Sequence, residues 1–142
     1  MYSKEEAAKL RQEFWISFGK SFPYKWTLYK TGVKNLSFRF YFDTKKAMVC
    51  IDIEGSEEER KECFEKMCSL KGILTEVFPE NTYQEHYFLE NGKEISRIWV
   101  EKSQVSIHNK ETWQQTMVFL HKRMLQIETF WEEYQDLSLI HI

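Results

Sequence analysis

The chain is poor in the residues that cross-link or interrupt a fold. Of 142 residues only three are cysteine, two proline and five glycine. An odd cysteine count without framework spacing argues against a disulfide scaffold. Cys63 and Cys68 lie five apart on a predicted helix and therefore point in different directions. The four histidines are scattered without ligand spacing, so we expect reduced thiols, no metal site and no cofactor.

Long apolar runs and catalytic motifs are also missing. No uncharged stretch approaches the roughly 20 apolar residues that cross a bilayer. The first six residues include the charged Lys4, Glu5 and Glu6 and do not begin an apolar segment. We therefore expect a cytoplasmic protein without a membrane segment. The chain has no Gly-x-Ser-x-Gly elbow and no glycine-rich phosphate loop. No catalytic residue is predicted.

What is present suits one globular domain over residues 1–142. Hydrophobic residues make up 42% and aromatic residues 16%, enough apolar surface to form a core at this length. Charge is unevenly placed. Ten basic and four acidic residues up to Lys46 give +6, whereas ten basic and eighteen acidic residues after it give −8. The asymmetry fits an anionic partner, and it fits equally two complementary halves of one fold.

Two runs that alternate apolar and polar residues predict a half-buried β-hairpin between residues 36 and 54. Matching the apolar faces around a turn at 44–46 pairs Phe42 with Val49, Phe40 with Ile51 and Phe38 with Ile53. This register places Arg39 opposite Asp52 on the outer face, as an exposed ion pair across the strands.

Three helices are predicted from caps and periodicity. Two capping boxes, each a serine followed three residues later by glutamate, begin helices at 4–19 and at 57–77. A third helix follows Asn109, with apolar residues every three or four positions from 113 to 134. This stripe favours a helix lying across the sheet, and a coiled-coil seam is the alternative.

A second hairpin, a short strand and an apolar C-terminal segment complete the expected fold. Asn91-Gly92 predicts a two-residue turn with positive φ at both positions, and a short strand is expected at 105–107. The class is α+β, an antiparallel sheet covered by three helices in the order α-β-β-α-β-β-(β)-α. The apolar residues in 137–142 are expected to add a strand or, like the last helix, to pack in a homodimer.

Three acidic residues on the first hairpin suggest a nuclease centre. Restriction-type nucleases hold a divalent metal with an acid on one strand and an acid-x-Lys triplet on the next. Glu54 stands where that lysine is needed, and the expected register separates Asp43 from Glu54 by about 20 Å. Both features count against a shared metal ion, so no metal residue is assigned. A divalent-metal nuclease using Asp52 and Glu54 stays as the alternative function.

A basic and aromatic stretch from residue 20 to 46 is the second candidate. Its lysines give salt-sensitive attraction to phosphates, and exposed aromatic rings stack on unpaired bases, which is typical of proteins that bind single-stranded nucleic acid. Strands also need aromatic residues for packing. A well-packed connection with solvated lysines explains the same composition.

Several segments together resemble a known family. They are Glu13-Phe14-Trp15, residues 29–34, Phe38-Arg39-Phe40, residues 91–98 and Phe130-Trp131. In that order they resemble a family of bacterial domains of unknown function, found alone or behind nuclease-like domains. The resemblance implies a noncatalytic binding or accessory module in nucleic-acid metabolism or defence, whose partner is nucleic acid or a nuclease-like protein. Its expected binding surface consists of Trp26, Tyr29, Lys30, Thr31, Lys34 and Arg97.

Overall fold

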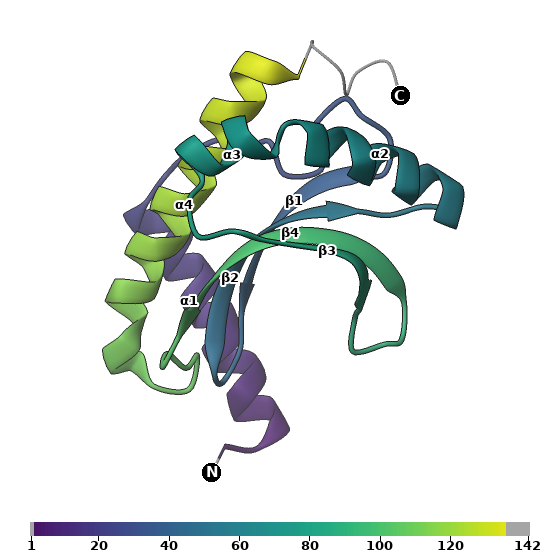
Figure 1. The fold of residues 1–142 in the computed structure, drawn as a ribbon. Helices are drawn as coiled ribbons and strands as arrows, with labels where there is room; N and C mark the ends of the chain where they lie inside the picture. Colours follow the sequence, from purple (N-terminus) through teal and green to yellow (C-terminus); the bar gives the residue numbers. More distant parts are fainter. Residues whose placement is uncertain (1, 136–142) are drawn as a thin grey trace.

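A computed structural model describes residues 2–135 as an antiparallel sheet with helices on its convex side (Figure 1). The strand order is β1-β2-β4-β3. The elements are α1 (Lys4–Ser21), β1 (Leu36–Phe42), β2 (Lys46–Ile53), α2 (Glu57–Ser69), α3 (Lys71–Val77), β3 (Thr82–Phe88), β4 (Glu94–Ser103), a 3-10 turn (Lys110–Thr112) and α4 (Trp113–Tyr134). The predicted α+β class is confirmed, with four α-helices instead of three. Residues 137–142, where a further strand or a dimer contact was expected, lie outside the described part.

Both predicted capping boxes form. The Ser3 hydroxyl accepts the Glu6 N–H and the Glu6 carboxylate accepts the Ser3 N–H, and Ser56 and Glu59 repeat this arrangement at α2. The second helix, however, does not continue to residue 77. It breaks at Leu70, where φ is −99° and ψ is 8°, and the Leu70 N–H bonds to Met67 O at 3.1 Å in a tightened last turn. Helices α2 and α3 therefore follow one another along the curved sheet.

The predicted register of the first hairpin is wrong by two residues. Phe42 pairs with Ala47, Phe40 with Val49 and Phe38 with Ile51. The turn is shorter than expected because the Asp43 N–H bonds to Lys46 O, while one Asp43 carboxylate oxygen accepts the N–H groups of Lys45 and Lys46. A shift of two residues keeps every side chain on its face, so alternation alone does not distinguish the two registers.

The second hairpin turn also differs from the prediction. Only Gly92 has positive φ, at +86°, and Asn91 does not. The Gly92 N–H bonds to Leu89 O and the Leu89 N–H bonds to Lys93 O, so the loop is longer than two residues. Asn91 instead accepts the Lys93 N–H with its side chain.

The short strand expected at 105–107 does not form. Val105 and Ile107 are buried in the core as part of a loop, which explains their apolar character. The Ile107 N–H bonds to the Asp43 carbonyl just beyond β1. Asn109 then begins the 3-10 turn by accepting the Glu111 N–H, and α4 follows.

The main core lies between the helices and the convex face of the sheet (Figure 1). Helix α1 packs on the first hairpin through Phe14, whose ring lies 4.7 Å from Phe42. The apolar stripe of α4 is buried in the same core, with Trp131 5.7 Å from Phe38, which confirms that this helix lies across the sheet. Within residues 2–135, no helix is both long enough and apolar enough to span a bilayer.

The concave face of the sheet carries no helix within the described residues. Figure 1 shows β3 and β4 curling as a hairpin around this face, and a register shift between Gln84 and Tyr87 interrupts their pairing. Met48, Cys50 and Ile95 are at most 1% exposed there, although they do not belong to the main core cluster. The curled hairpin therefore encloses a second, smaller buried layer.

Candidate functional site

The connection from α1 to β1 is held in place from two sides. The Thr27 N–H and hydroxyl each donate to one carboxylate oxygen of Glu128 on α4, both at 2.7 Å. The Leu28 carbonyl accepts the Phe38 N–H at 3.0 Å, so the connection runs along the outer edge of β1. This fixed backbone positions the side chains that follow it.

Two of the expected binding residues take part in packing. Trp26 is half-buried, with its ring 5.4 Å from Phe40 and 5.6 Å from His121. Thr31 is only 3% exposed, and its hydroxyl donates to the Leu36 carbonyl at 2.9 Å and accepts the Val33 N–H. Their contacts organise the connection from within.

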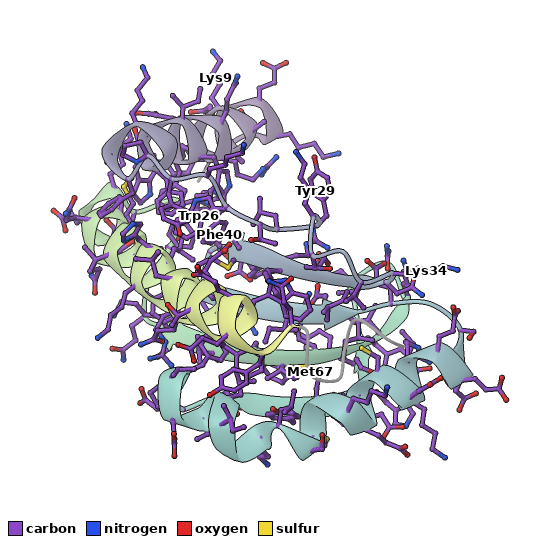
Figure 2. All side chains as sticks on the ribbon, turned by 90° about the horizontal axis from the view of Figure 1, so that it is seen from above. Lys9, Trp26, Tyr29, Lys34, Phe40 and Met67 are labelled. Atoms are coloured by element: carbon purple, nitrogen blue, oxygen red, sulfur yellow. The ribbon has the colours of Figure 1, made fainter. Side chains whose placement is uncertain are left out.

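Three other expected residues stand on its outside. Tyr29 is 75% exposed, and the Lys30 ammonium lies 6.0 Å from the centre of its ring. Lys34 is exposed and approaches Glu59 at 3.7 Å. In Figure 2 the side chains of Tyr29 and Lys34 project outward, whereas Trp26 and Phe40 lie together inside. The structure therefore groups Tyr29, Lys30 and Lys34 on one exposed loop.

Arg97 lies apart from this loop, on the concave face. Its Nε and Nη2 donate to the two carboxylate oxygens of Asp52 at 2.7 and 2.9 Å, and the guanidinium stacks 4.5 Å from the Tyr87 ring. Burial works against the charged form of Arg97, but the hydrogen bonds to Asp52, together with charge interactions with Cys50, Asp52 and Tyr87, outweigh it and raise the pKa of Arg97. The predicted Arg39–Asp52 pair is wrong, because Arg39 pairs with Cys50 in the register and Asp52 is 1% exposed.

A hollow of about 450 Å³ lies along the outer edge of β1, and we call it the edge hollow. It is lined by Trp15, Leu28, Tyr29, Ser37, Phe38, Arg39, Phe40 and Glu54. Glu54 forms an ion pair with Lys93. Arg39 is exposed and makes no hydrogen bond or ion pair with any residue in the described range. An unpaired guanidinium and an exposed tyrosine thus share one hollow.

A second hollow, of about 590 Å³, occupies the concave face, and we call it the concave hollow. Its lining comes from β1 and β2, from β4 and from the tip of the β3–β4 hairpin: Arg39, Phe40, Tyr41, Asp43, Lys45, Lys46, Met48, Tyr87, Phe88, Leu89, Glu90, Asn91 and Arg97. Arg39 and Phe40 line both hollows, so the two meet across β1.

Two groups beside the concave hollow stay protonated at neutral pH. Burial, followed by hydrogen bonding to Asp43, raises the pKa of Tyr41, whose hydroxyl donates to Asp43 at 2.8 Å. Burial raises the pKa of Cys50 to about 12, so this thiol is no thiolate nucleophile.

The acidic residues of the proposed nuclease alternative are already engaged. Both Asp52 oxygens accept from Arg97, and Glu54 pairs with Lys93. Asp43 lies in the turn at the other end of the hairpin, where it binds backbone N–H groups. Across residues 2–135, no group of three or more His, Cys, Asp or Glu side chains is arranged to hold a metal ion.

Of the residues that line the concave hollow, the expected binding surface included only Arg97 and missed the others. Alternation does place Arg39 and Tyr41 on the face opposite the buried phenylalanines, so a signal for these two exists. Tyr87 and Phe88 approach them only because the β3–β4 hairpin curls, and no local pattern predicts that long-range contact.

The geometry defines a class of protein, an α+β domain with one helix-covered sheet face and one open concave face. The chain belongs to the family described as a domain of unknown function, DUF4268, whose family model matches residues 10–135. No curated protein matches the chain, and no solved structure matches it.

Proposed function

We propose that this domain is a noncatalytic module that binds nucleic acid through the edge of β1. The binding surface, which we call the edge patch, consists of Tyr29, Lys30 and Lys34 on the loop and Arg39 on β1. The observation that carries the proposal is that Tyr29, 75% exposed, lines the same hollow as Arg39, which has no ion-pair partner within residues 2–135. Cationic side chains bind phosphates, and an exposed ring is a platform for a base.

Packing does not account for these side chains. Tyr29 is the most exposed of the large hydrophobic residues described, and Lys30 lies beside its ring. Arg39 forms no ion pair with another residue of the described chain. Holding a loop rigidly while its aromatic and basic side chains face solvent is typical of a binding loop.

The charge distribution supports a defined orientation on the ligand. The residues up to Lys46, which include the edge patch, carry a net charge of +6, and the rest carries −8. Helix α2 begins with Glu57, Glu58 and Glu59, and Glu59 lies 3.7 Å from Lys34, so this acidic cluster borders one end of the edge patch. A polyanion is therefore attracted to Lys30 and Arg39 and repelled at the α2 end of the patch.

The wider role follows from the family resemblance and is part of the same proposal. Bacterial domains of this kind stand alone or behind nuclease-like domains. A module that holds nucleic acid would deliver it to such a nuclease-like partner, in nucleic-acid metabolism or defence. In this role the module itself cuts nothing.

Fluorescence anisotropy with a labelled 20-nucleotide DNA or RNA strand tests the proposal. Affinity should fall steeply with salt, and the Lys30→Glu/Arg39→Glu variant should weaken binding at least ten-fold, with a salt slope smaller by about 0.7 for each lost phosphate contact. Lys30→Glu alone should also weaken binding, and Lys61→Glu on α2 is its matched control, since it makes the same charge change on an exposed lysine away from the edge patch.

Three outcomes contradict the proposal. The first is absence of binding at low salt, and the second is equal loss of binding in the Lys61→Glu control. The third is magnesium-dependent cleavage of the strand that disappears in an Asp52→Asn variant whose circular dichroism spectrum matches that of the wild type, which would favour the divalent-metal nuclease.

A further inference from the structure

The concave hollow combines aromatic rings with positive charge. Tyr87, near the tip of the β3–β4 hairpin, lines the hollow, with Arg97 4.5 Å from its ring and Trp99 5.3 Å away. The next residue, Phe88, pairs with Glu94, whose carboxylate bonds to Arg60 on α2, so the exposed Phe88 ring lies on the other face of the hairpin. Across the hollow lies Tyr41, fixed by its bond to Asp43. Rigid rings facing an open hollow present flat surfaces on which a planar ligand stacks.

The cations lie on the β1–β2 side of this hollow. Arg39 and Lys45 are exposed and make no side-chain ion pair within the described residues, while Lys46 lies 3.5 Å from Glu101. Two acidic residues also line the hollow. Asp43 already accepts hydrogen bonds from Tyr41 and from two backbone N–H groups, and Glu90 stands on the opposite rim. A ligand that fits this arrangement is anionic along β1 and planar in the hollow.

The concave hollow and the edge hollow share two lining residues of β1, Arg39 and Phe40. A strand whose phosphates lie beside Tyr29 and Lys30 can therefore continue past Arg39 toward the concave hollow. A cavity volume of about 590 Å³ is in the range of small-molecule sites, and it accommodates one or two nucleobases.

We propose that the concave hollow receives unpaired bases of a strand whose phosphates lie along Arg39 and the edge patch, which makes the domain selective for single-stranded nucleic acid. The inference rests on the proposed function. Bases within a duplex are stacked and paired, and each must be unstacked before it enters such a hollow, at a cost of a few kcal/mol. A single strand avoids this cost. Stacking on aromatic side chains tolerates any base, so the selectivity is for strandedness and not for sequence.

Tyr41→Leu tests the inference, because the Tyr41 ring lines the concave hollow and lies outside the main core. With a 12-nucleotide strand carrying 2-aminopurine, binding should change the fluorescence of that base. Tyr41→Leu should reduce this change and weaken single-strand affinity by about five-fold or more. Binding to a duplex of the same length should stay unchanged. Tyr24→Leu, the same change at a tyrosine that is 49% exposed and does not line the hollow, is the control.

Lys45→Glu provides a second variant within the same hollow. Lys45 is exposed, and this change should weaken single-strand binding while leaving the circular dichroism spectrum unaltered.

The outcomes separate the two proposals. If the strand binds and Lys30→Glu/Arg39→Glu weakens binding, but Tyr41→Leu leaves both affinity and 2-aminopurine fluorescence as in the wild type, the inference fails and the proposed function stands. Equal affinity for single strand and duplex overturns the inference in the same way. If the wild-type domain binds no nucleic acid at low salt, both fail.

Discussion

Arg97 binds Asp52 through two parallel hydrogen bonds, Nε to one carboxylate oxygen at 2.7 Å and Nη2 to the other at 2.9 Å. The residues are partners in the β2–β4 register, and both are at most 4% exposed. Tyr87 covers the guanidinium. The pair therefore joins the two central strands on a face that no helix covers within the described chain, and its arginine lines the concave hollow together with Met48.

Removing one partner of this pair should destabilise the fold strongly. Arg97→Met leaves the Asp52 carboxylate buried without its donor, which costs about 3–5 kcal/mol of unfolding free energy. Urea denaturation followed by circular dichroism measures this loss. Arg39→Met on the neighbouring strand is the control, and it should change stability by no more than about 0.5 kcal/mol because Arg39 is exposed and has no ion-pair partner among the described residues.

The double variant Asp52→Leu/Arg97→Met should recover most of the lost stability, since apolar residues of similar volume need no charge partner. A double variant as unstable as Arg97→Met alone would show that packing of the arginine stem, and not the unpaired charge, causes the loss.

Gly55 should not tolerate a side chain. Its φ is +104°, and a Cβ there would lie 2.5 Å from the Asn35 side-chain nitrogen. Gly55→Ala should therefore lower the unfolding free energy by about 1–3 kcal/mol, measured by thermal or urea denaturation. Gly19→Ala is the matched control. A Cβ at Gly19 meets nothing within 4 Å and the residue lies in α1, so this change should stabilise by about 0.5–1 kcal/mol.

Asp43 should contribute to stability in a pH-dependent way. Burial raises its pKa, but the hydrogen bonds from Lys45 N–H, the Tyr41 hydroxyl and Lys46 N–H outweigh burial and lower the pKa below the ordinary 3.8. Its contribution is therefore complete above the unfolded-state pKa and disappears as the pH falls through the folded-state pKa. The stability difference between wild type and Asp43→Asn should shrink between about pH 5 and about pH 2. A difference that stays constant over this range contradicts the assignment.

The three thiols should react unequally. Cys50 and Cys63 are buried and Cys68 is exposed. Burial raises the pKa of Cys63 to about 11 and that of Cys50 to about 12, which leaves both largely protonated. Native protein treated with iodoacetamide at pH 8 should incorporate one label by mass spectrometry, at Cys68, and urea-unfolded protein should incorporate three. Rapid labelling of Cys50 in the native state would show that the concave face opens.

Local signals predicted the fold best, and long-range contacts limited the rest. The capping boxes at Ser3 and Ser56 formed as expected, because each depends only on residues three apart. The break between α2 and α3 falls at Leu70, where no glycine or proline stands to predict a helix end. The hairpin register was wrong by two because alternation repeats with the same period.

The candidate site shows the same division. Tyr29, Lys30 and Lys34 were found together because they are neighbours in sequence. Thr31 was assigned to the surface from its neighbours, whereas its hydroxyl is used inside the loop. Arg97 lies on the other face because strand pairing with Asp52, forty-five residues away, decides its position.

Backbone hydrogen bonds from two loops cover the outer edge of β1 near both of its ends. Near its beginning the Leu28 carbonyl bonds to the Phe38 N–H, and just past its end the Ile107 N–H bonds to the Asp43 carbonyl. Among residues 2–135, these two contacts leave a short span of β1 backbone between them for pairing with a foreign strand. Loops that shield a sheet margin in this way hinder association into fibrils, so loosening either one should make the protein prone to aggregate on heating.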